Sequence, residues 1–242
     1  MRTRNKRNKL SNSFKFKQFT IEFGEAGMPV STDGVLLGAW VNLLDSSNLI
    51  DIGTGTGLLS LMCAQRNEDI QILALDIEAT AIQSARSNIE NSSWKKQIQV
   101  QHGDILQFLP ERTFDTIVCN PPYFNSGETA QDVSRAIARH TSSLGHLALI
   151  RHCKKILSSH GKANFILPID EGRQFILLAE QEQWHVSRLC EVRPTEKKPV
   201  HRLLIELSLE PTRCEKSKLT IRNGNEYSQA FIDLTKEFYL KM

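Results

Sequence analysis

Asp51-Ile52-Gly53-Thr54-Gly55-Thr56-Gly57-Leu58 joins a strand-like stretch to a helix-forming stretch through three alternating glycines. Leu49 to Ile52 is largely apolar, as in a buried strand, and the residues from Leu58 to Gln65 suit a helix. Glycine adopts positive φ values and lets a ligand approach the backbone, while a helix N-terminus offers free N–H groups. The stretch therefore predicts an α/β fold with a site for a nucleotide-containing cofactor.

The spacing of these glycines also limits the choice of cofactor. The dinucleotide fingerprint needs a glycine at position 58, where this chain has Leu58. We therefore expect no NAD-dependent oxidoreductase. Taken alone, the motif is also compatible with a glycine turn that binds nothing.

Strand and helix patterns alternate from residue 48 onward. Strands are expected at 49–52, 70–75, 98–100, 113–119 and 162–167, and helices at 58–65, 78–91, 144–157 and 171–181. Right-handed crossovers would stack these strands into one parallel sheet with helices on both faces. Two more alternating stretches, 184–192 and 200–209, predict an antiparallel hairpin that ends the sheet, and residues 226–240 predict a terminal helix. The expected fold is α/β and Rossmann-like, with a seven-stranded, mostly parallel sheet and an antiparallel C-terminal hairpin.

Acidic side chains lie in or after three successive strands of this expected sheet. They are Asp51, Asp76 and Asp104. Ligands of open α/β sheets bind at the carboxyl edge, where these strands end. Asp76 can accept both hydrogen bonds of a ribose diol, although its position also suits a cap for the next helix. Asp104 can accept from an adenine amine, so the three acids and the glycine turn together predict a nucleotide site at this edge.

The stretch Asn120-Pro121-Pro122-Tyr123 follows the strand expected at 113–119. Pro121 cannot donate to a sheet ladder, so the strand must end at about Asn120, at the same carboxyl edge. An amide, a proline carbonyl and a flat ring are displayed together there, which suits a planar substrate that carries an amine. A strand followed by a proline turn is the alternative for Asn-Pro alone.

Two of these motifs resemble those of a known enzyme class. The turn from Asp51 to Gly57 resembles motif I of class I S-adenosylmethionine-dependent methyltransferases, and Asn120 to Tyr123 matches the Asn-Pro-Pro-Tyr motif of those that modify adenine N6 or a glutamine amide. The resemblance implies that Asn120 Oδ1 and the Pro121 carbonyl accept the two amine hydrogens, which aims the nitrogen lone pair at the sulfonium methyl. Tyr123 would stack on the base, which must first be unstacked from its neighbours.

With the segment from Met28 to Gly34 and the short basic N-terminus, the chain resembles the bacterial tRNA1(Val) adenine N6-methyltransferase family over most of its length. The resemblance implies S-adenosylmethionine as the cofactor, tRNA as the partner, and methylation of the adenine 3′ of the anticodon. The implied cofactor contacts are Thr32, Asp51, Gly53, Gly55, Gly57, Asp76, Ile77, Asp104 and Asn120, and the implied catalytic residues are Asn120, Pro121 and Tyr123.

The net charge of +3 hides a basic N-terminal segment. Residues 1–17 contain seven Lys or Arg and no acid, so the rest of the chain has a net charge of −4. We expect residues 1–17 to form an arm, and residues 18–242 to form a single methyltransferase domain. Such an arm either stays solvated or neutralises phosphates. The expected RNA contacts are Arg4, Lys6, Arg7, Lys9 and Lys15 in the arm and Arg139 and His140 after the catalytic motif.

The composition excludes several other classes of protein. The five cysteines are scattered and the seven histidines form no obvious pair, so we expect no metal site, no disulfide framework and a cytoplasmic location. No apolar run approaches the length of a membrane span. No motif decides the oligomeric state, and we expect a monomer.

Three alternatives share some of these features. A protein glutamine N5-methyltransferase carries the same motif, but it resembles a core preceded by a helical domain, and only about thirty residues precede the first core helix here. A DNA adenine methyltransferase would need an added target-reading region, which this sequence does not show. An RNA-binding module without catalysis would keep the basic arm, although the intact Asn120 and Tyr123 argue against it.

Overall fold

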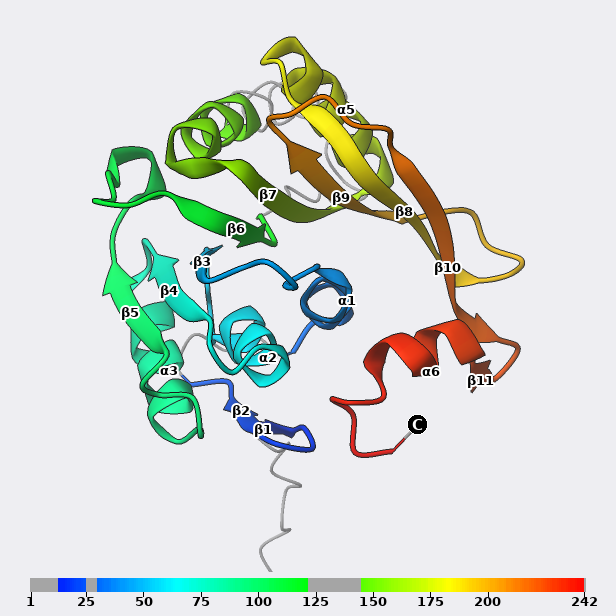
Figure 1. Ribbon diagram of the computed structural model, residues 1–242. Coiled ribbons are helices and arrows are strands. Elements are labelled where there is room, and N and C mark those ends of the chain that lie inside the picture. The colour runs from blue at the N-terminus through cyan, green and yellow to red at the C-terminus, as the bar shows by residue number, and fades with distance from the viewer. Residues whose placement is uncertain (1–12, 25–29, 122–144, 242) are drawn as a thin grey trace, which may run out of the picture.

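The computed structural model describes residues 13–24, 30–121 and 145–241. It contains a nine-stranded sheet with the strand order β11-β10-β8-β9-β7-β6-β3-β4-β5, and a separate β1-β2 hairpin (Figure 1). The parallel strands are β3 (Asn48–Ile52), β4 (Gln71–Asp76), β5 (Ile98–His102), β6 (Phe114–Cys119) and β7 (Leu157–Pro168). The helices beside them are α2 (Leu58–Arg66), α3 (Ala79–Glu90), residues 145–156 and α5 (Ile169–Gln181).

The parallel strands are buried on both faces because their apolar side chains point both ways. Leu49 and Val118 belong to the core under α1 (Thr32–Trp40), α2 and α3, whereas Ile50 and Ile117 belong to the core under α5 and the helix at 145–156. Helices therefore cover both faces, as Figure 1 shows. The expected α/β class with a mostly parallel sheet is confirmed.

The order of the parallel strands creates a switch point between β3 and β6. The chain runs from β3 to β4 and β5 on one side, and then returns to place β6 and β7 on the other side of β3. In open α/β sheets, ligands bind outside the carboxyl ends of the strands at such a point.

Helix α1 packs closely on α2 because two of its glycines leave room. A Cβ atom at Gly34 would lie 2.9 Å from Leu58 Cδ2, and one at Gly38 would lie 2.8 Å from Met62 Sδ. The hydroxyl of Ser31 accepts a hydrogen bond from the Gly34 amide at 3.0 Å and caps α1. This packing fixes the start of α2, directly after the glycine turn.

The C-terminal half of the sheet differs from the expectation. β8 (His185–Thr195) and β9 (Arg202–Ser208) form the predicted antiparallel hairpin, but β10 (Glu215–Asn223) pairs in parallel with β8, and β11 (Glu226–Tyr227) pairs with β10. The predicted count of seven strands is therefore too low, and the hairpin does not end the sheet. β10 carries mostly exposed polar side chains, as strands near the edge of a sheet do. Only a short part of its sequence alternates between apolar and polar residues, so the sequence did not predict it.

The terminal helix is shorter than expected. α6 spans Gln229–Thr235 rather than residues 226–240, because the chain before it first pairs as β11. Phe231 and Phe238 are nevertheless buried in the core, so the chain does pack back on the body.

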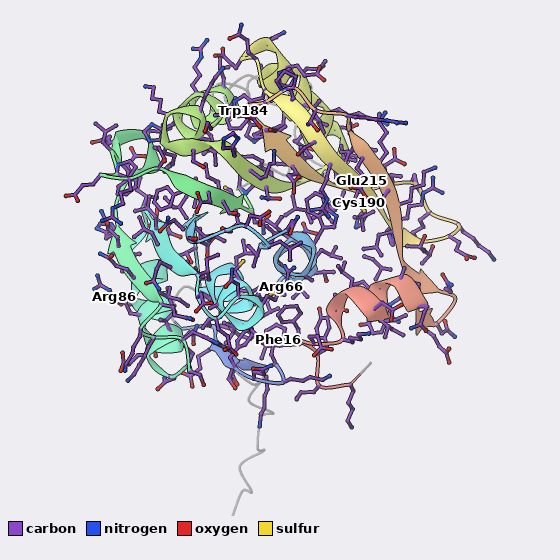
Figure 2. All side chains as sticks on the ribbon, in the orientation of Figure 1. Phe16, Arg66, Arg86, Trp184, Cys190 and Glu215 are labelled. Atoms are coloured by element: carbon purple, nitrogen blue, oxygen red, sulfur yellow. The ribbon has the colours of Figure 1, made fainter. Side chains whose placement is uncertain are left out.

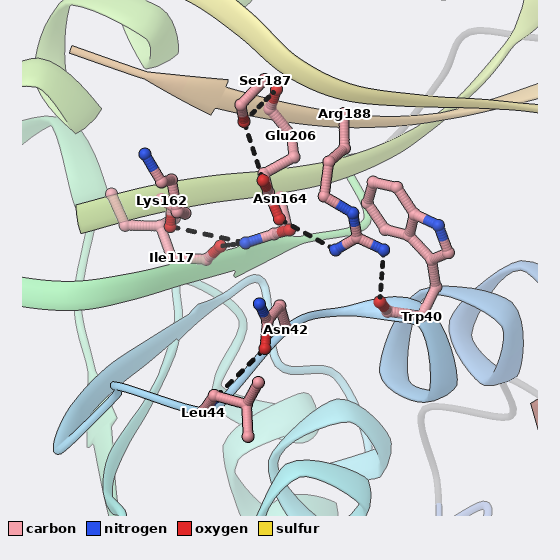
Figure 3. Close-up of polar contacts among 9 residues, drawn as sticks. All are labelled: Trp40, Asn42, Leu44, Ile117, Lys162, Asn164, Ser187, Arg188 and Glu206. Carbon is pink, nitrogen blue, oxygen red and sulfur yellow. Dashed lines mark hydrogen bonds and ion pairs between the residues drawn. The ribbon is translucent and has the colours of Figure 1, made fainter. Parts of the chain in front are cut away.

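A polar cluster ties the C-terminal half to α1 (Figure 3). Arg188 Nη1 lies 3.0 Å from Glu206 Oε2, and Ser187 Oγ donates to Glu206 Oε1 at 2.7 Å. The Arg188 guanidinium also lies 4.2 Å from the centroid of the Trp40 ring and donates to the Trp40 carbonyl at 3.4 Å. The buried Glu206 carboxylate thus has a partner on each oxygen.

The described part of the basic N-terminal segment packs on the body. β1 (Ser13–Lys15) pairs with β2 (Thr20–Glu22), and Phe16 is fully buried between Phe19 and Tyr239 (Figure 2). The Lys17 amide donates to the Phe238 carbonyl at 2.8 Å. Residues 13–22 therefore form a hairpin that packs on the body, and residues 13–17 of the expected arm belong to it.

Candidate active site

A cavity of about 410 Å³ lies at the carboxyl ends of β3, β4, β5 and β6. It is lined by Ile52, Gly53, Leu75, Asp76, Ile77, Gly103, Asp104, Ile105, Leu106, Cys119, Pro121, Gly145, His146 and Leu149. Its size is within the range of small-molecule sites, roughly 300–1,000 Å³. The cavity spans the switch point and brings five of the predicted residues together: Gly53, Asp76, Ile77, Asp104 and Pro121.

The glycine turn takes the backbone shape that the sequence predicts. Gly53, Gly55 and Gly57 have φ values of +71°, +58° and +83°, which side-chain-bearing residues rarely adopt. The Gly53 amide donates to the Leu75 carbonyl at 2.9 Å, and the Gly55 amide donates to Asp76 Oδ2 at 2.8 Å. The Thr54 amide also donates to the Leu75 carbonyl, at 3.0 Å, so three hydrogen bonds join the turn to the end of β4.

Asp51 is fully buried beneath this turn. Its Oδ2 accepts hydrogen bonds from Thr54 Oγ1 and Ser60 Oγ, each at 2.7 Å, and from the Ser60 amide at 3.1 Å. Its Oδ1 is buried and has no hydrogen-bond partner in the described part of the chain. Burial raises the pKa of Asp51 to about 6, although the hydrogen bonds from Thr54 and Ser60 oppose the rise. Such a carboxylate suits a ligand cation or donor that reaches Oδ1.

Asp76 joins the glycine turn to α3. Besides the bond from Gly55, its Oδ1 accepts from the Glu78 amide at 2.9 Å, and Glu78 is the residue that caps α3. Each carboxylate oxygen can accept more than one hydrogen bond, so the side chain can still receive a diol from the cavity that it lines. The cofactor role that the sequence suggested for Asp76 fits its position, whereas the N-cap residue of α3 is Glu78 and not Asp76.

An apolar slot forms the part of the cavity beside β5. Ile77 and Leu106 are 59% and 47% exposed, which is unusual for such side chains and leaves their surfaces open to a flat ring. Asp104 accepts from the Leu106 amide at 2.9 Å and caps the short 3-10 helix η1 (Ile105–Gln107). The Ile77 carbonyl lies 2.8 Å from His102 Nε2, which holds this strand end in place.

Asn120 directly follows β6 at the switch point. Its Oδ1 is buried and has no hydrogen-bond partner among the residues that the structure describes. Pro121, the next residue, lines the cavity. An unpartnered amide oxygen beside a cavity is an acceptor that a ligand can satisfy.

Several predicted residues lie elsewhere. Thr32 is exposed at the start of α1 and is not among the residues that line the cavity. Lys15 is exposed on the β1-β2 hairpin and lines a separate depression with Asn88 and Asn91. The predictions at Arg4, Lys6, Arg7, Lys9, Tyr123, Arg139 and His140 fall outside the described residues.

The structure adds one residue that the sequence did not suggest, His146. It lines the cavity, is only 7% exposed, contacts Phe175 edge to face at 5.4 Å, and has no hydrogen-bond partner among the described residues. Burial lowers the pKa of His146, although the charge of Glu171 opposes this, so the neutral imidazole is favoured. His140, His146 and His152 recur every six residues in the sequence, a spacing that does not keep them on one helical face, so the sequence gives no signal for this role.

Two other kinds of site, a metal centre and a membrane-spanning helix, are absent from the described ranges. These ranges contain no group of three or more His, Cys, Asp or Glu side chains that could hold a metal ion. None of their helices is both long enough and apolar enough to cross a membrane.

Comparisons with known proteins agree with this geometry. Residues 31–167 match the family model described as "Methyltransferase small domain". A tRNA1(Val) (adenine(37)-N6)-methyltransferase of Vibrio campbellii is 55% identical over 96% of this chain and 97% of its own length. A protein of the same name from Vibrio cholerae is 56% identical over 98% of this chain and 99% of its own length.

Solved structures share the fold at low identity. A predicted O-methyltransferase from Agrobacterium tumefaciens matches with a TM-score of 0.68 at 16% identity, covering 85% of this chain and 96% of that one. The glycopeptide N-methyltransferase MtfA, solved with S-adenosylmethionine, matches with a TM-score of 0.55 at 13% identity, covering 75% of this chain and all of the other.

Proposed function

This chain belongs to the tRNA1(Val) (adenine(37)-N6)-methyltransferase family, and from that premise we infer that it transfers a methyl group from S-adenosylmethionine to N6 of the adenine 3′ of the anticodon in tRNA1(Val). The observation that carries the chemistry is the buried, unpartnered Asn120 Oδ1 beside a cavity that Pro121 lines. The relatives' names favour adenine, whereas the Asn-Pro-Pro-Tyr motif alone is equally compatible with glutamine.

The cavity residues fit S-adenosylmethionine part by part. Asp51 Oδ1 is a buried acceptor without a donor, which suits the ammonium group of the cofactor's amino acid part. Asp76 suits the ribose hydroxyls, and the open surfaces of Ile77 and Leu106 suit the two faces of the adenine ring. Asp104 lies at the same end of the cavity and can accept from the adenine amine.

Asn120 and Pro121 orient the target amine. When bound, S-adenosylmethionine would supply an electrophilic methyl group, whose bond to sulfur breaks so that S-adenosylhomocysteine leaves. Asn120 Oδ1 and the Pro121 carbonyl accept the two hydrogens of the exocyclic nitrogen, so that its lone pair no longer delocalises into the ring. The same two oxygens then stabilise the positive charge that develops on the nitrogen as the new bond forms. No strong base is required before the transfer, since the extra proton leaves afterwards to solvent.

The remaining expected residues complete the proposal. Tyr123 stacks on the flipped adenine, and Thr32, Gly55 and Gly57 support the cofactor from the α1 start and the glycine turn. Arg4, Lys6, Arg7, Lys9, Lys15, Arg139 and His140 contact the RNA. The protein acts as a monomer in the cytoplasm, where its tRNA substrate is.

A reconstituted reaction tests this function. Purified protein is incubated with S-adenosylmethionine and a tRNA1(Val) transcript, and the digested nucleosides are analysed by mass spectrometry. We expect one N6-methyladenosine per transcript, and none in a matched transcript that carries guanine in place of the target adenine. Methylation of both transcripts, or of neither, would contradict the assignment.

A further inference from the structure

The strand β10, which the sequence did not predict, has a residue in the same row across the sheet as the end of β6, where the catalytic motif begins. Cys119 on β6 pairs with Phe165 on β7, Phe165 with Ile205 on β9, Ile205 with Leu189 on β8, and Leu189 with Lys216 on β10. Four strand spacings separate the two ends of this row, about 19 Å along the sheet. Lys216 therefore lies level with the residue that precedes Asn120.

β8 and β10 then continue past the carboxyl edge of the sheet. Both run in the same direction as β6, because β7 is parallel to β6 and both β7 and β8 are antiparallel to β9. Lys218 is two residues beyond the row, opposite Glu191, and Arg193 is two residues further, opposite Thr220. At about 3.3 Å per residue, Arg193 stands about 13 Å beyond the level of Cys119. The two strands thus form a wall beside the cavity mouth.

This wall is basic and exposed on one face. Side chains alternate along a strand, so Lys216 and Lys218 point away from Leu219, which is buried in the core toward α6. Lys216 and Lys218 line an open depression with Leu189 and Glu191, and they are solvent-exposed. The turn after β8 adds two more exposed lysines, Lys197 and Lys198.

Few carboxylates lie near the positive charges of this wall in the described ranges. Residues 191–198 and 216–218 contain five cations, which are Arg193, Lys197, Lys198, Lys216 and Lys218, and two carboxylates, which are Glu191 and Glu196. None of the five cations forms an ion pair with a residue of the described ranges, although Lys218 is directly opposite Glu191. A surface with five unpaired cations and only two carboxylates favours the binding of a polyanion.

We propose that Arg193, Lys197, Lys198, Lys216 and Lys218 form a docking surface for the phosphate backbone of the tRNA substrate, on one flank of the active site. This inference rests on the proposed function, because it assumes that the substrate is RNA. The target base has to leave its stack and enter the cavity, so the neighbouring backbone must be held while the base is turned out. Phosphate contacts fix register and orientation without reading the sequence.

The experiment compares two double variants on this surface with a matched pair on the opposite edge of the sheet. The surface variants are Lys216→Gln with Lys218→Gln, and Lys197→Gln with Lys198→Gln. The control is Lys96→Gln with Lys155→Gln, two exposed lysines that precede β5 and β7 and therefore lie at the amino edge. The affinity for tRNA1(Val) is measured at several salt concentrations, with the cofactor affinity and the steady-state constants measured alongside.

We expect each surface variant to bind tRNA roughly tenfold more weakly and to lower the slope of log affinity against log salt by about one unit per lysine removed. The KM for tRNA should rise, while kcat and cofactor affinity stay unchanged. Wild-type affinity and slope in both surface variants, or an equal change in the control, would overturn the docking surface. If the unmodified protein does not methylate tRNA at all, the proposed function is wrong. That result is distinct from an unmodified protein that methylates tRNA and surface variants that bind it normally, which would contradict only the docking surface.

Discussion

Two buried carboxylates differ in how fully they are paired. Asp51 lies at the cofactor edge, which is the carboxyl edge of the sheet beside the cavity, and Glu206 lies in the C-terminal half. Glu206 is 3% exposed and has both oxygens engaged, one of them by the cation of Arg188. Asp51 is fully buried, has one oxygen without a partner, and faces no cation among its hydrogen-bond partners. A buried charge without a partner costs stability, so its persistence points to a ligand that supplies the partner.

A neutral polar group beside the cavity is unpartnered in the same way as Asp51, although unpartnered buried groups also occur away from the cavity, such as Asn164 Oδ1 next to Glu206. Asn120 Oδ1 also has no hydrogen-bond partner within the described ranges, and Asn120 directly precedes Pro121, which lines the cavity. Asp51 and Asn120 each have an oxygen that a ligand can engage, and leaving these oxygens unpartnered costs stability. Both oxygens of Glu206, in contrast, are already engaged within the protein. The two regions should therefore respond in opposite ways to substitution.

The largest effect is expected for Asn120→Ala. The variant loses an acceptor that is needed only as charge develops on the target nitrogen, so turnover should fall at least about a thousandfold. The free energy of unfolding and the affinity for S-adenosylmethionine should stay close to those of the unmodified protein, because Asn120 Oδ1 bonds nothing in the described structure. Methyl-transfer assays, urea denaturation and calorimetric titration measure these three quantities. Turnover that is unchanged would remove Asn120 from the mechanism.

Arg188→Ala should have the opposite profile. It leaves the Glu206 carboxylate buried without its cation, which should lower the free energy of unfolding by about 3 kcal/mol, near the lower end for buried pairs because Arg188 is 26% exposed. Cofactor affinity should not change. The matched control, Arg188→Met with Glu206→Gln, removes both charges and should recover most of the loss in urea denaturation. A control that is as unstable as the single variant would show that packing on Trp40, and not charge, dominates.

The cofactor edge could be predicted from the sequence because its signals are local. Gly53 and Pro121 restrict the backbone in ways that few other residues share, and the apolar run around Ile117 and Val118 can only be buried on both faces. These signals give the strand ends, and parallel strands bring their carboxyl ends to one edge. The position of Asp76 follows from the same rule.

The rest of the structure depends on contacts that local patterns do not show. β10 pairs with β11 only at its last two residues, and its charged side chains face water, so only Leu219 and Ile221 mark it as a strand. His146 lines the cavity because of how the helix at 145–156 docks on the sheet, which its spacing does not encode. The unpaired oxygen of Asp51 is likewise a result of packing, since its sequence neighbours Thr54 and Ser60 both bond the other oxygen.

Asp51→Asn should sharpen the contrast between the two carboxylates. Asp51 has a pKa of about 6 in the folded protein and an ordinary value of 3.8, so between these pH values the folded state holds more protons than the unfolded chain. Its contribution to stability therefore falls as pH rises from about 4 to about 6, by up to about 3 kcal/mol in all. Asparagine keeps an acceptor for Thr54 and Ser60 without the charge. The variant should be more stable at pH 7 by up to that amount, and its stability should vary less over this pH window.

The same variant should bind the cofactor more weakly, because an amide cannot pair with the ammonium group as a carboxylate does. Thermal unfolding between pH 4 and pH 7 and calorimetric titration measure the two effects. Asp115→Asn is a matched control, since Asp115 is a strand carboxylate that bonds Ser47, Asn48 and Ser158 rather than the cavity. An Asp51 variant whose stability keeps the pH dependence of the unmodified protein would mean that the buried carboxylate is not the group that titrates.

Asp76→Asn should affect both stability and cofactor binding, each to a moderate extent. Asp76 accepts from the Gly55 and Glu78 amides, so it both stabilises the turn and faces the cavity. Asparagine can satisfy only one of these amides, and turns an N–H group toward the other, which should cost about 1 to 2 kcal/mol of stability. It also loses charged acceptors for the ribose hydroxyls, so cofactor affinity should fall roughly tenfold to a hundredfold. The 2′ hydroxyl alone accounts for part of this loss. The ratio of the affinities of the unmodified protein and the variant should therefore be smaller for a 2′-deoxy analogue of S-adenosylhomocysteine than for S-adenosylhomocysteine itself. An equal affinity ratio for both ligands would show that Asp76 has only a structural role. Asp51 would then be the carboxylate at this edge that binds the cofactor.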